Sequence, residues 1–210
     1  MLKGISRYEI GMESIATISD ALLEASGLLK GLPIINTAVA FYTATNNFIN
    51  KHNLNKLYGF INSFNNDLVN NAELEAHIKS LHKNKDVLNQ EMEYVLVILE
   101  RQLEYDKSSI LAKFYLQYLK GEISWTEFVE YSAILERLIL SDASALWQCN
   151  NSDGIRYEDT EDISSIFRLL ALGLVYMPAK NTHGALARAD GYVDFKPTIS
   201  GRKFSEILNL

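Results

Sequence analysis

A run of twenty residues without a charged side chain, from Gly31 to Asn50, constrains this chain more than any other feature. Lys30 and Lys51 bracket the run, and a helix of that length can cross a bilayer. Seven of its residues are Asn or Thr, however, and lipid would leave their polar groups without partners. A buried helical hairpin is therefore favoured over a membrane span, with Gly31 ending one helix and Pro33 in the first turn of the next.

This hairpin is also the first candidate site. If it were released, its apolar residues would contact a membrane or a protein partner. The main ones are Leu32, Ile34, Ile35, Val39, Phe41, Tyr42 and Phe48. In the favoured interpretation they lie in the core instead, because helices that are apolar on all sides are typical of protein interiors.

Composition bounds the class of protein. The chain has 210 residues, of which 48% are hydrophobic and 22% charged, and this is typical of a folded globular protein. Its formal net charge of −6 argues against a protein whose whole surface binds nucleic acid, although it is compatible with a local basic patch. The single Cys149 excludes an intramolecular disulfide and a zinc site built from several cysteines. The first residues, MLKGISRYE, lack the apolar segment of a secretory signal, so a cytoplasmic location is expected.

Hydrophobic periodicity predicts a mainly α-helical fold with a multi-helix body over residues 1–122. Its central helix is expected over Asp86–Leu103, where Leu88, Met92, Val95 and Leu99 repeat at helical spacing and YVLVILE is apolar on almost every side. The other predicted helices cover Tyr8–Leu29, Leu54–Phe64, Asn71–Leu81 and Asp106 or Ser108 to Gly121, with a loop over Asn65, Asn66 and Asp67.

A second part is predicted over residues 123–210. Ser124 and Glu127 have the spacing of a capping box, in which each residue satisfies a backbone N–H of the other, so a helix is expected to begin there. This helix is expected to bury Phe128, Val129, Leu135, Leu138 and Ile139.

Shorter elements follow. Helices are predicted over Asp142–Gln148 and Asp162–Leu172, separated by the polar loop NNSDGIRYEDTED. Thr160 or Asp162 is expected to cap the second helix, and Gly173 is expected to end it. A strand, a loop and a second strand come next, before a closing helix after Pro197.

This order of elements resembles a winged-helix domain. LLALGLVY, at Leu169–Tyr176, is similar to the end of a third helix that continues into the first strand of a wing. TISGRKFSEIL is similar to the T-x-x-G motif that often opens the helix after the wing. The resemblance covers about Ser124–Leu210, and it implies a winged-helix-like part with one β-hairpin, packed on the helical body.

The whole chain also resembles small uncharacterised bacterial helical proteins. They share KGLPII at Lys30–Ile35 and ILERLILSD at Ile134–Asp142. This resemblance implies a bacterial origin and a shared fold, and it implies no activity.

A winged helix that binds DNA needs polar or basic side chains on its third helix and phosphate contacts from its wing. The predicted third helix offers only Ser164, Ser165 and Arg168, and acidic residues precede it: Glu158, Asp159, Glu161 and Asp162. In the wing region the basic residues outnumber Asp190 and Asp194, and they are the candidate nucleic-acid contacts: Lys180, Arg188, Lys196, Arg202 and Lys203. Packing or partner binding is the favoured role of the wing, given the acidic approach.

The sequence carries no catalytic or cofactor motif. His77 and His82 are five residues apart, so they point to different sides of a helix and cannot share a metal ion. H-E-x-x-H and the glycine-rich phosphate and dinucleotide motifs are absent from the sequence. We therefore expect no enzyme activity, no cofactor and no metal.

The favoured hypothesis is a non-catalytic interaction or regulatory protein that binds a protein partner or a second copy of itself. The alternatives are a DNA-binding regulator that uses the wing and a membrane-active defence or toxin effector that uses the hairpin.

Overall fold

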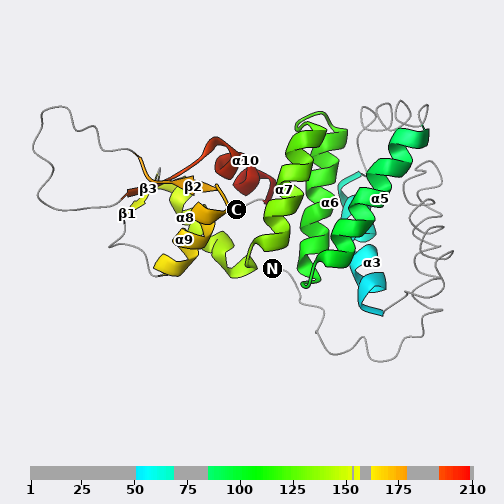
Figure 1. Cartoon of the computed structure of the whole chain (residues 1–210), viewed down its shortest axis with the longest axis horizontal. Helices are drawn as coiled ribbons and strands as arrows, with labels where there is room; N and C mark the ends of the chain where they lie inside the picture. Colours follow the sequence, from blue (N-terminus) through cyan, green and yellow to red (C-terminus); the bar gives the residue numbers. More distant parts are fainter. Residues whose placement is uncertain (1–50, 69–84, 153, 157–161, 179–193, 209–210) are drawn as a thin grey trace, which may run out of the picture. The chain divides into compact units, whose positions relative to one another are not determined.

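The computed structural model describes residues 51–68, 85–152, 154–156, 162–178 and 194–208. In these residues the fold is mainly α-helical with a small three-stranded antiparallel sheet (Figure 1). The chain divides into two compact units, Met1–Glu122 and Ile123–Leu210. The predicted hairpin over Tyr8–Asn50, with its first arm at Tyr8–Leu29, and the helix predicted over Asn71–Leu81 lie outside the described residues. That the second part packs on the first stays a prediction.

Helices α3 (Lys51–Leu68), α5 (Lys85–Arg101) and α6 (Asp106–Leu119) make up the described part of the first unit. α3 packs along α6 and also contacts α5. The rings of Phe60 and Phe64 on α3 lie 6.3 and 6.1 Å from the ring of Tyr115 on α6. The predicted core positions Val95 and Leu99 are buried, with exposed fractions of 2% and 0%. Other buried side chains of this core are Leu57, Ile61, Leu96, Ile98, Leu111, Phe114 and Leu119.

α3 is longer than predicted. The loop expected over Asn65, Asn66 and Asp67 is wrong, since the helix continues to Leu68. Phe64 is 1% exposed and packs against Tyr115, and this contact holds the end of α3 on α6. Asn has a low helix propensity, but propensity is a weak term that tertiary packing readily overrides.

A buried lysine closes the end of α5. Lys56 on α3 is 1% exposed, and its Nζ donates hydrogen bonds to the carbonyl oxygens of Glu100 (2.9 Å) and Gln102 (3.0 Å). The last carbonyls of a helix have no partner within the helix, and a cation is stabilised there by the helix dipole. Burial lowers the pKa of Lys56, and the nearby charge of Glu100 partly opposes this shift.

α5 ends at Arg101 rather than at the predicted Leu103, whose side chain is exposed.

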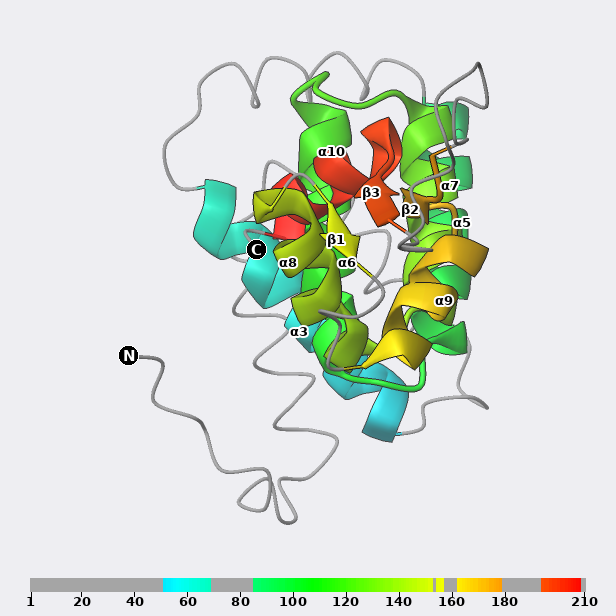
Figure 2. The ribbon, with the colours of Figure 1, turned by 90° about the vertical axis from the view of Figure 1, so that its left-hand side faces the viewer.

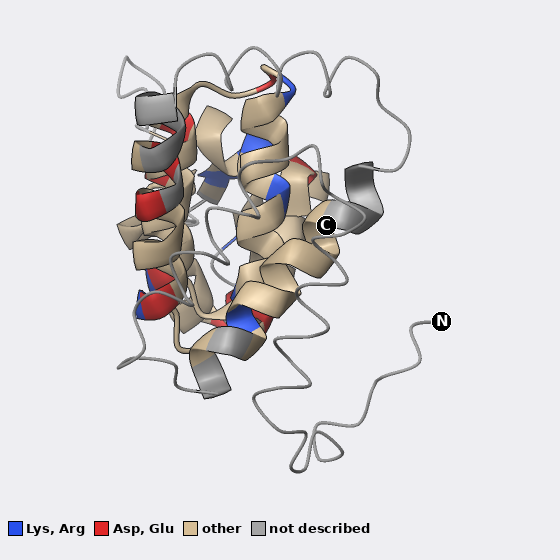
Figure 3. Cartoon of the chain, turned by 90° about the vertical axis from the view of Figure 1, so that its right-hand side faces the viewer, with Lys and Arg blue, Asp and Glu red and all other residues tan. Residues whose placement is uncertain are grey.

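Glu91, Glu93 and Glu100 lie on α5, whereas α6 carries Asp106 together with Lys107 and Lys113 (Figure 3). Glu91 is buried and accepts hydrogen bonds from the hydroxyl groups of Tyr118 (2.7 Å) and Tyr115 (3.3 Å) on α6. Burial raises the pKa of both tyrosines, so they stay protonated as donors. This polar contact joins α5 to α6 within the apolar core.

The second unit contains four described α-helices and one 3-10 turn. They are α7 (Trp125–Arg137), η1 (Leu140–Asp142), α8 (Ala143–Asn151), α9 (Ile163–Ala171) and α10 (Ile199–Leu208). The predicted capping box is confirmed. The hydroxyl of Ser124 accepts from the N–H of Glu127 (3.2 Å), and the carboxylate of Glu127 accepts from the N–H of Ser124 (2.7 Å).

α7 contacts α10 in the core of this unit. Tyr131 and Phe204 contact edge to face, with ring centroids 5.7 Å apart. Phe128, Leu135 and Leu138 are buried as predicted. The prediction for Ile139 is wrong, because α7 ends at Arg137, the backbone then becomes extended, and the side chain of Ile139 is 47% exposed.

The sheet has one strand more than the predicted hairpin. Its order is β1-β3-β2, with β1 at Ile155–Arg156, β2 at Val175–Tyr176 and β3 at Asp194–Pro197 (Figure 2). β1 lies in the segment predicted as a polar loop. Two residues are too few to show an alternating pattern, and Ile155 becomes 5% exposed only through pairing with Phe195 on β3.

The T-x-x-G segment has a packing role in this structure. The hydroxyl of Thr198 accepts from the N–H of Gly201 (2.9 Å) and lies 2.8 Å from the carbonyl oxygen of Gly173, to which it can donate. A Cβ at Gly201 would lie 1.9 Å from the carbonyl oxygen of Leu174. Only glycine therefore lets the first turn of α10 approach the chain entering β2 so closely.

The first prediction concerns the core of the first unit. Leu99→Asp should unfold it, because an unpaired carboxylate in an apolar interior costs several kcal/mol, against a total stability of about 5–15 kcal/mol. Val97→Asp is the matched control on the same helix, at a side chain that is 41% exposed, and it should cost no more than about 1 kcal/mol. Far-UV circular dichroism during urea unfolding measures both. Equal stability of the two variants would contradict the assignment of the buried face of α5.

The second prediction concerns Gly201. Gly201→Ala should destabilise the second unit by about 1–3 kcal/mol or more, since the added methyl meets a backbone carbonyl that cannot move aside cheaply. Helix propensity alone predicts the opposite sign, by about 1 kcal/mol. Glu206→Ala, at an exposed position of α10, is the control. Both tryptophans of the chain, Trp125 and Trp147, belong to this unit, so fluorescence during urea unfolding reports its stability. A stabilised Gly201→Ala variant would show that α10 lies further from Leu174.

Candidate interaction surface of the second unit

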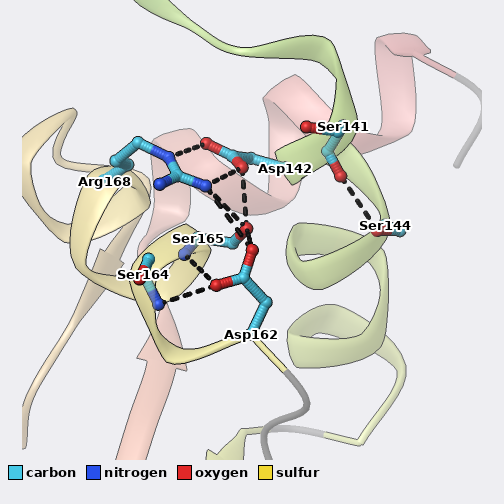
Figure 4. A network of polar contacts seen from close by, with 7 residues as sticks. All are labelled: Ser141, Asp142, Ser144, Asp162, Ser164, Ser165 and Arg168. Carbon is cyan, nitrogen blue, oxygen red and sulfur yellow. Dashed lines mark hydrogen bonds and ion pairs between the residues drawn. The ribbon is translucent and has the colours of Figure 1, made fainter.

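A buried ion pair fixes α9 to the start of α8. The carboxylate of Asp142, the last residue of η1, is fully buried. Arg168 on α9 holds it with two hydrogen bonds, from Nε to Oδ2 (2.7 Å) and from Nη2 to Oδ1 (2.6 Å), as Figure 4 shows. This two-pronged geometry is the strong form of an arginine–carboxylate contact. The side chain of Arg168 is 39% exposed, so its charge reaches the surface while its donors point inward.

Ser165 and Asp162 complete the network (Figure 4). The hydroxyl of Ser165 lies 2.7 Å from carboxylate oxygens of both Asp142 and Asp162, and it accepts from Nη2 of Arg168 at 3.0 Å. Because a hydroxyl has one hydrogen, Ser165 donates to one carboxylate at a time. Asp162 also accepts from the N–H groups of Ser164 (3.0 Å) and Ser165 (3.3 Å). Of the two predicted caps, Asp162 is therefore the residue that caps α9.

The network favours the charged form of each member. Hydrogen bonds from Arg168 and Ser165 lower the pKa of Asp142 against the opposing effect of burial. The hydroxyl of Ser165, followed by the backbone N–H groups at the start of α9, lowers the pKa of Asp162. The hydrogen bond to Asp142 raises the pKa of Arg168. The single positive charge of Arg168 thus faces two carboxylates, of which that of Asp142 is buried and that of Asp162 is exposed.

This network determines which side chains of α9 are available at the surface. The sequence suggested Ser164, Ser165 and Arg168 as the side chains available for DNA. Ser165 is buried and Arg168 is engaged with Asp142, so of the three only Ser164 is an exposed side chain outside the ion pair. The outward side of α9 also carries Phe167, which is 48% exposed and meets the ring of Phe195 edge to face at 5.8 Å. Just beyond α9, Tyr176 and Met177 are 43% and 49% exposed.

The predicted basic contacts of the wing have different surroundings. Lys180 and Arg188 lie outside the described residues. Nζ of Lys203 on α10 donates to Oε1 of Glu127 at 3.1 Å, which ties it to the capping box of α7. Arg202 is exposed on α10, and Lys196 lies in the middle of β3, partly exposed. Lys203 is thus part of a contact between α10 and the start of α7.

The solvent face of the sheet brings together residues that the sequence left apart. Tyr176 on β2 is the cross-strand partner of Lys196 on β3. Arg156 on β1 is exposed and pairs with Asp194, two residues from Lys196 along β3. Gly154 lies beneath Lys196, since a Cβ there would meet Cγ of the lysine at 3.2 Å. Arg156 was missed because it belongs to a two-residue strand beside an acidic stretch, and no local pattern marks it.

Other candidate residues are not placed by the structure. The hairpin residues Leu32, Ile34, Ile35, Val39, Phe41, Tyr42 and Phe48 lie outside the described residues, so their exposure stays a hypothesis. In the described part of the chain, no group of three or more His, Cys, Asp or Glu side chains is placed to hold a metal ion. Among the described helices, none has both the length and the hydrophobicity needed to cross a membrane.

Comparison of the chain with protein-family models, with curated proteins and with solved structures gave no match.

The third prediction is a pH dependence. The folded-state pKa values of Asp142 and Asp162 lie below those of an unfolded chain, so their contribution to stability is present above the unfolded value of about 3.9. It is lost as the pH falls through the folded-state values. The second unit should thus become less stable as the pH drops below about 4. Asp142→Asn should be less stable at neutral pH and should lose less on acidification.

Glu130→Gln, which removes an exposed carboxylate on α7, is the control for this experiment. Urea unfolding followed by tryptophan fluorescence at several pH values measures all three proteins. If Asp142→Asn keeps the acid sensitivity of the wild type, the ion pair with Arg168 is not its source.

Proposed function

We propose that this protein is a non-catalytic binding protein that acts through protein–protein contacts, and that its second unit is a winged-helix-like interaction module. The order of elements supports the module. α9 is the third described α-helix of the unit, and β2, β3 and α10 follow it. The sheet order β1-β3-β2 places the two strands on either side of the presumed wing, β2 and β3, next to each other.

The observation that carries the proposal is the ion pair between Arg168 and the buried Asp142. A DNA-binding helix would have to turn this guanidinium toward phosphate. Doing so would leave a fully buried carboxylate without its cation, which is strongly unfavourable. The helix that should read DNA therefore uses its one basic side chain for its own attachment.

Magnitudes also weigh against the wing as a DNA contact. Of the described wing candidates, Lys203 pairs with Glu127, and Lys196 and Arg202 also interact with other groups of the chain. Each phosphate contact contributes about 0.9 to the dependence of log affinity on log salt. Two contacts would thus give a slope of about 1.8. A protein that makes about six to ten phosphate contacts would have a much steeper slope and a higher affinity for DNA. The net charge of −6 adds a general repulsion.

The exposed apolar side chains favour a protein partner instead. Aromatic residues and methionine are enriched at the centres of protein interfaces. Phe167, Tyr176 and Met177 supply such side chains on α9 and at the end of β2, with 43–49% of each exposed. A bacterial and cytoplasmic setting, expected from the sequence, is compatible with this proposal. The partner is a different protein or a second copy of the chain.

The fourth prediction tests this function with surface variants. Met177→Glu and Phe167→Glu should abolish capture of a partner protein, or self-association measured by sedimentation velocity, because a carboxylate would then be buried at the interface. Ile139→Glu, at an equally exposed apolar side chain between α7 and η1, should leave binding unchanged. Tryptophan fluorescence during thermal melting checks that each variant is folded.

Gel retardation of DNA duplexes at low salt supplies the opposing outcome, and the wild type should retard none. If it does bind DNA, and if Lys196→Ala and Arg202→Ala each lower the salt slope by about 0.9, the DNA-binding regulator replaces the proposal.

A further inference from the structure

We infer that the end of α5 contains an internal water site, in which water binds the buried side-chain amide of Gln102 beside the ammonium group of Lys56. The site lies in the first unit and is independent of the proposed binding function. Its protein groups come from α3 and from the residue that directly follows α5.

The side chain of Gln102 is buried without a partner. The residue is 1% exposed, yet neither Oε1 nor Nε2 has a hydrogen-bond partner among the residues that the structure describes. Its main chain, in contrast, is satisfied. The N–H donates to the carbonyl oxygen of Ile98 (3.2 Å), and the carbonyl oxygen accepts from Nζ of Lys56 (3.0 Å). Nearly all buried polar groups in folded proteins bond to protein or to ordered water, so this amide indicates a bound molecule.

Lys56 offers a further donor at the same place. Its ammonium group has three N–H bonds, and two of them donate to the carbonyl oxygens of Glu100 and Gln102. Within the described part of the chain, no carboxylate forms an ion pair with Lys56. Burial lowers the pKa of Lys56, because the charged form loses its hydration. A water oxygen that accepts from the third N–H returns part of that hydration and stabilises the charged form.

The surroundings select a small neutral molecule. Lys56 repels a cation. An anion is disfavoured as well, since the last carbonyl oxygens of α5 form the negative end of the helix dipole and Glu100 adds a negative charge. The molecule must both donate and accept, because an amide offers an acceptor oxygen and a donor nitrogen. Water meets these conditions, and a buried water molecule typically makes about three hydrogen bonds to such groups.

Nuclear magnetic resonance of the full chain, labelled with ¹⁵N, tests the site through contacts between water and the side-chain amide protons of Gln102. A long-lived internal water should give cross-peaks of opposite sign in laboratory-frame and rotating-frame experiments, whereas chemical exchange gives the same sign in both. The side-chain amide of Gln90, at an exposed position of α5, is the control and should lack cross-peaks of opposite sign. The absence of such cross-peaks at Gln102, or equal ones at Gln90, would overturn the inference.

Gln102→Met provides a second measurement, because Met is of similar length and lacks the amide. If water satisfies the amide, the variant deprives that water of a partner and should unfold at a lower urea concentration than the wild type. Gln90→Met is the matched control and should leave the midpoint nearly unchanged, with far-UV circular dichroism as the measurement.

A higher midpoint for Gln102→Met would mean that the amide has no water, since removal of an unsatisfied buried polar group stabilises a protein. If the variant fails to fold, the wild-type spectra decide alone. Neither result alters the proposed function, which rests on the second unit.

Discussion

The carboxylate of Asp142 is shielded from water, and its charge is balanced by the guanidinium of Arg168. α9 has nine residues, too few for a stable helix on its own. It is held by the burial of Ile166 and Leu169, by the Asp162 cap and by this ion pair. Burial of Ile166 and Leu169 sets which side of the helix faces the core, and the ion pair holds Arg168 against Asp142. Phe167 stays 48% exposed.

The first unit also contains buried charged groups that are held by hydrogen bonds. Lys56 buries its ammonium group against the last carbonyls of α5, and Glu91 is buried beneath two tyrosine hydroxyls of α6. Buried charges are costly without partners. Lys56 thus joins α3 to the end of α5, and Glu91 joins α5 to α6. Such contacts add directional constraints that apolar packing alone does not supply. The three helices are thus joined by specific polar contacts as well as by the aromatic contacts of Phe60, Phe64 and Tyr115.

The second unit combines a rigid frame with a chemically mixed surface. Thr198 and Gly201 lock α10 against the chain entering β2, while Lys203 and Glu127 join α10 to α7. Thr198, Gly201 and Lys203, which lie in the segment that resembles a winged-helix motif, thereby make contacts within the unit. Phe167 on α9 and Tyr176 and Met177 around β2 remain exposed, and the basic residues Arg156 and Arg202 are exposed as well. Such a mixture suits a protein partner, in which apolar anchors and a few charges share one interface.

The sequence by itself determined the features that depend on neighbouring residues. The capping box at Ser124 and Glu127, the helix end at Gly173 and the apolar stripe through Val95 and Leu99 require contacts across only one or two helical turns. The sequence also identified Arg168 and Lys203 as residues of interest, but for a role that their contacts do not favour.

Tertiary structure alone decided what depends on residues distant in the chain. β1 exists because Ile155 pairs with Phe195, α3 reaches Leu68 because Phe64 packs on Tyr115, and Arg168 turns inward because Asp142 lies 26 residues earlier. None of these pairings leaves a periodic signal in the sequence, since each forms only when the core brings its members together. The direction of each functional side chain is therefore set by long-range burial of charge and apolar surface, which local patterns cannot encode.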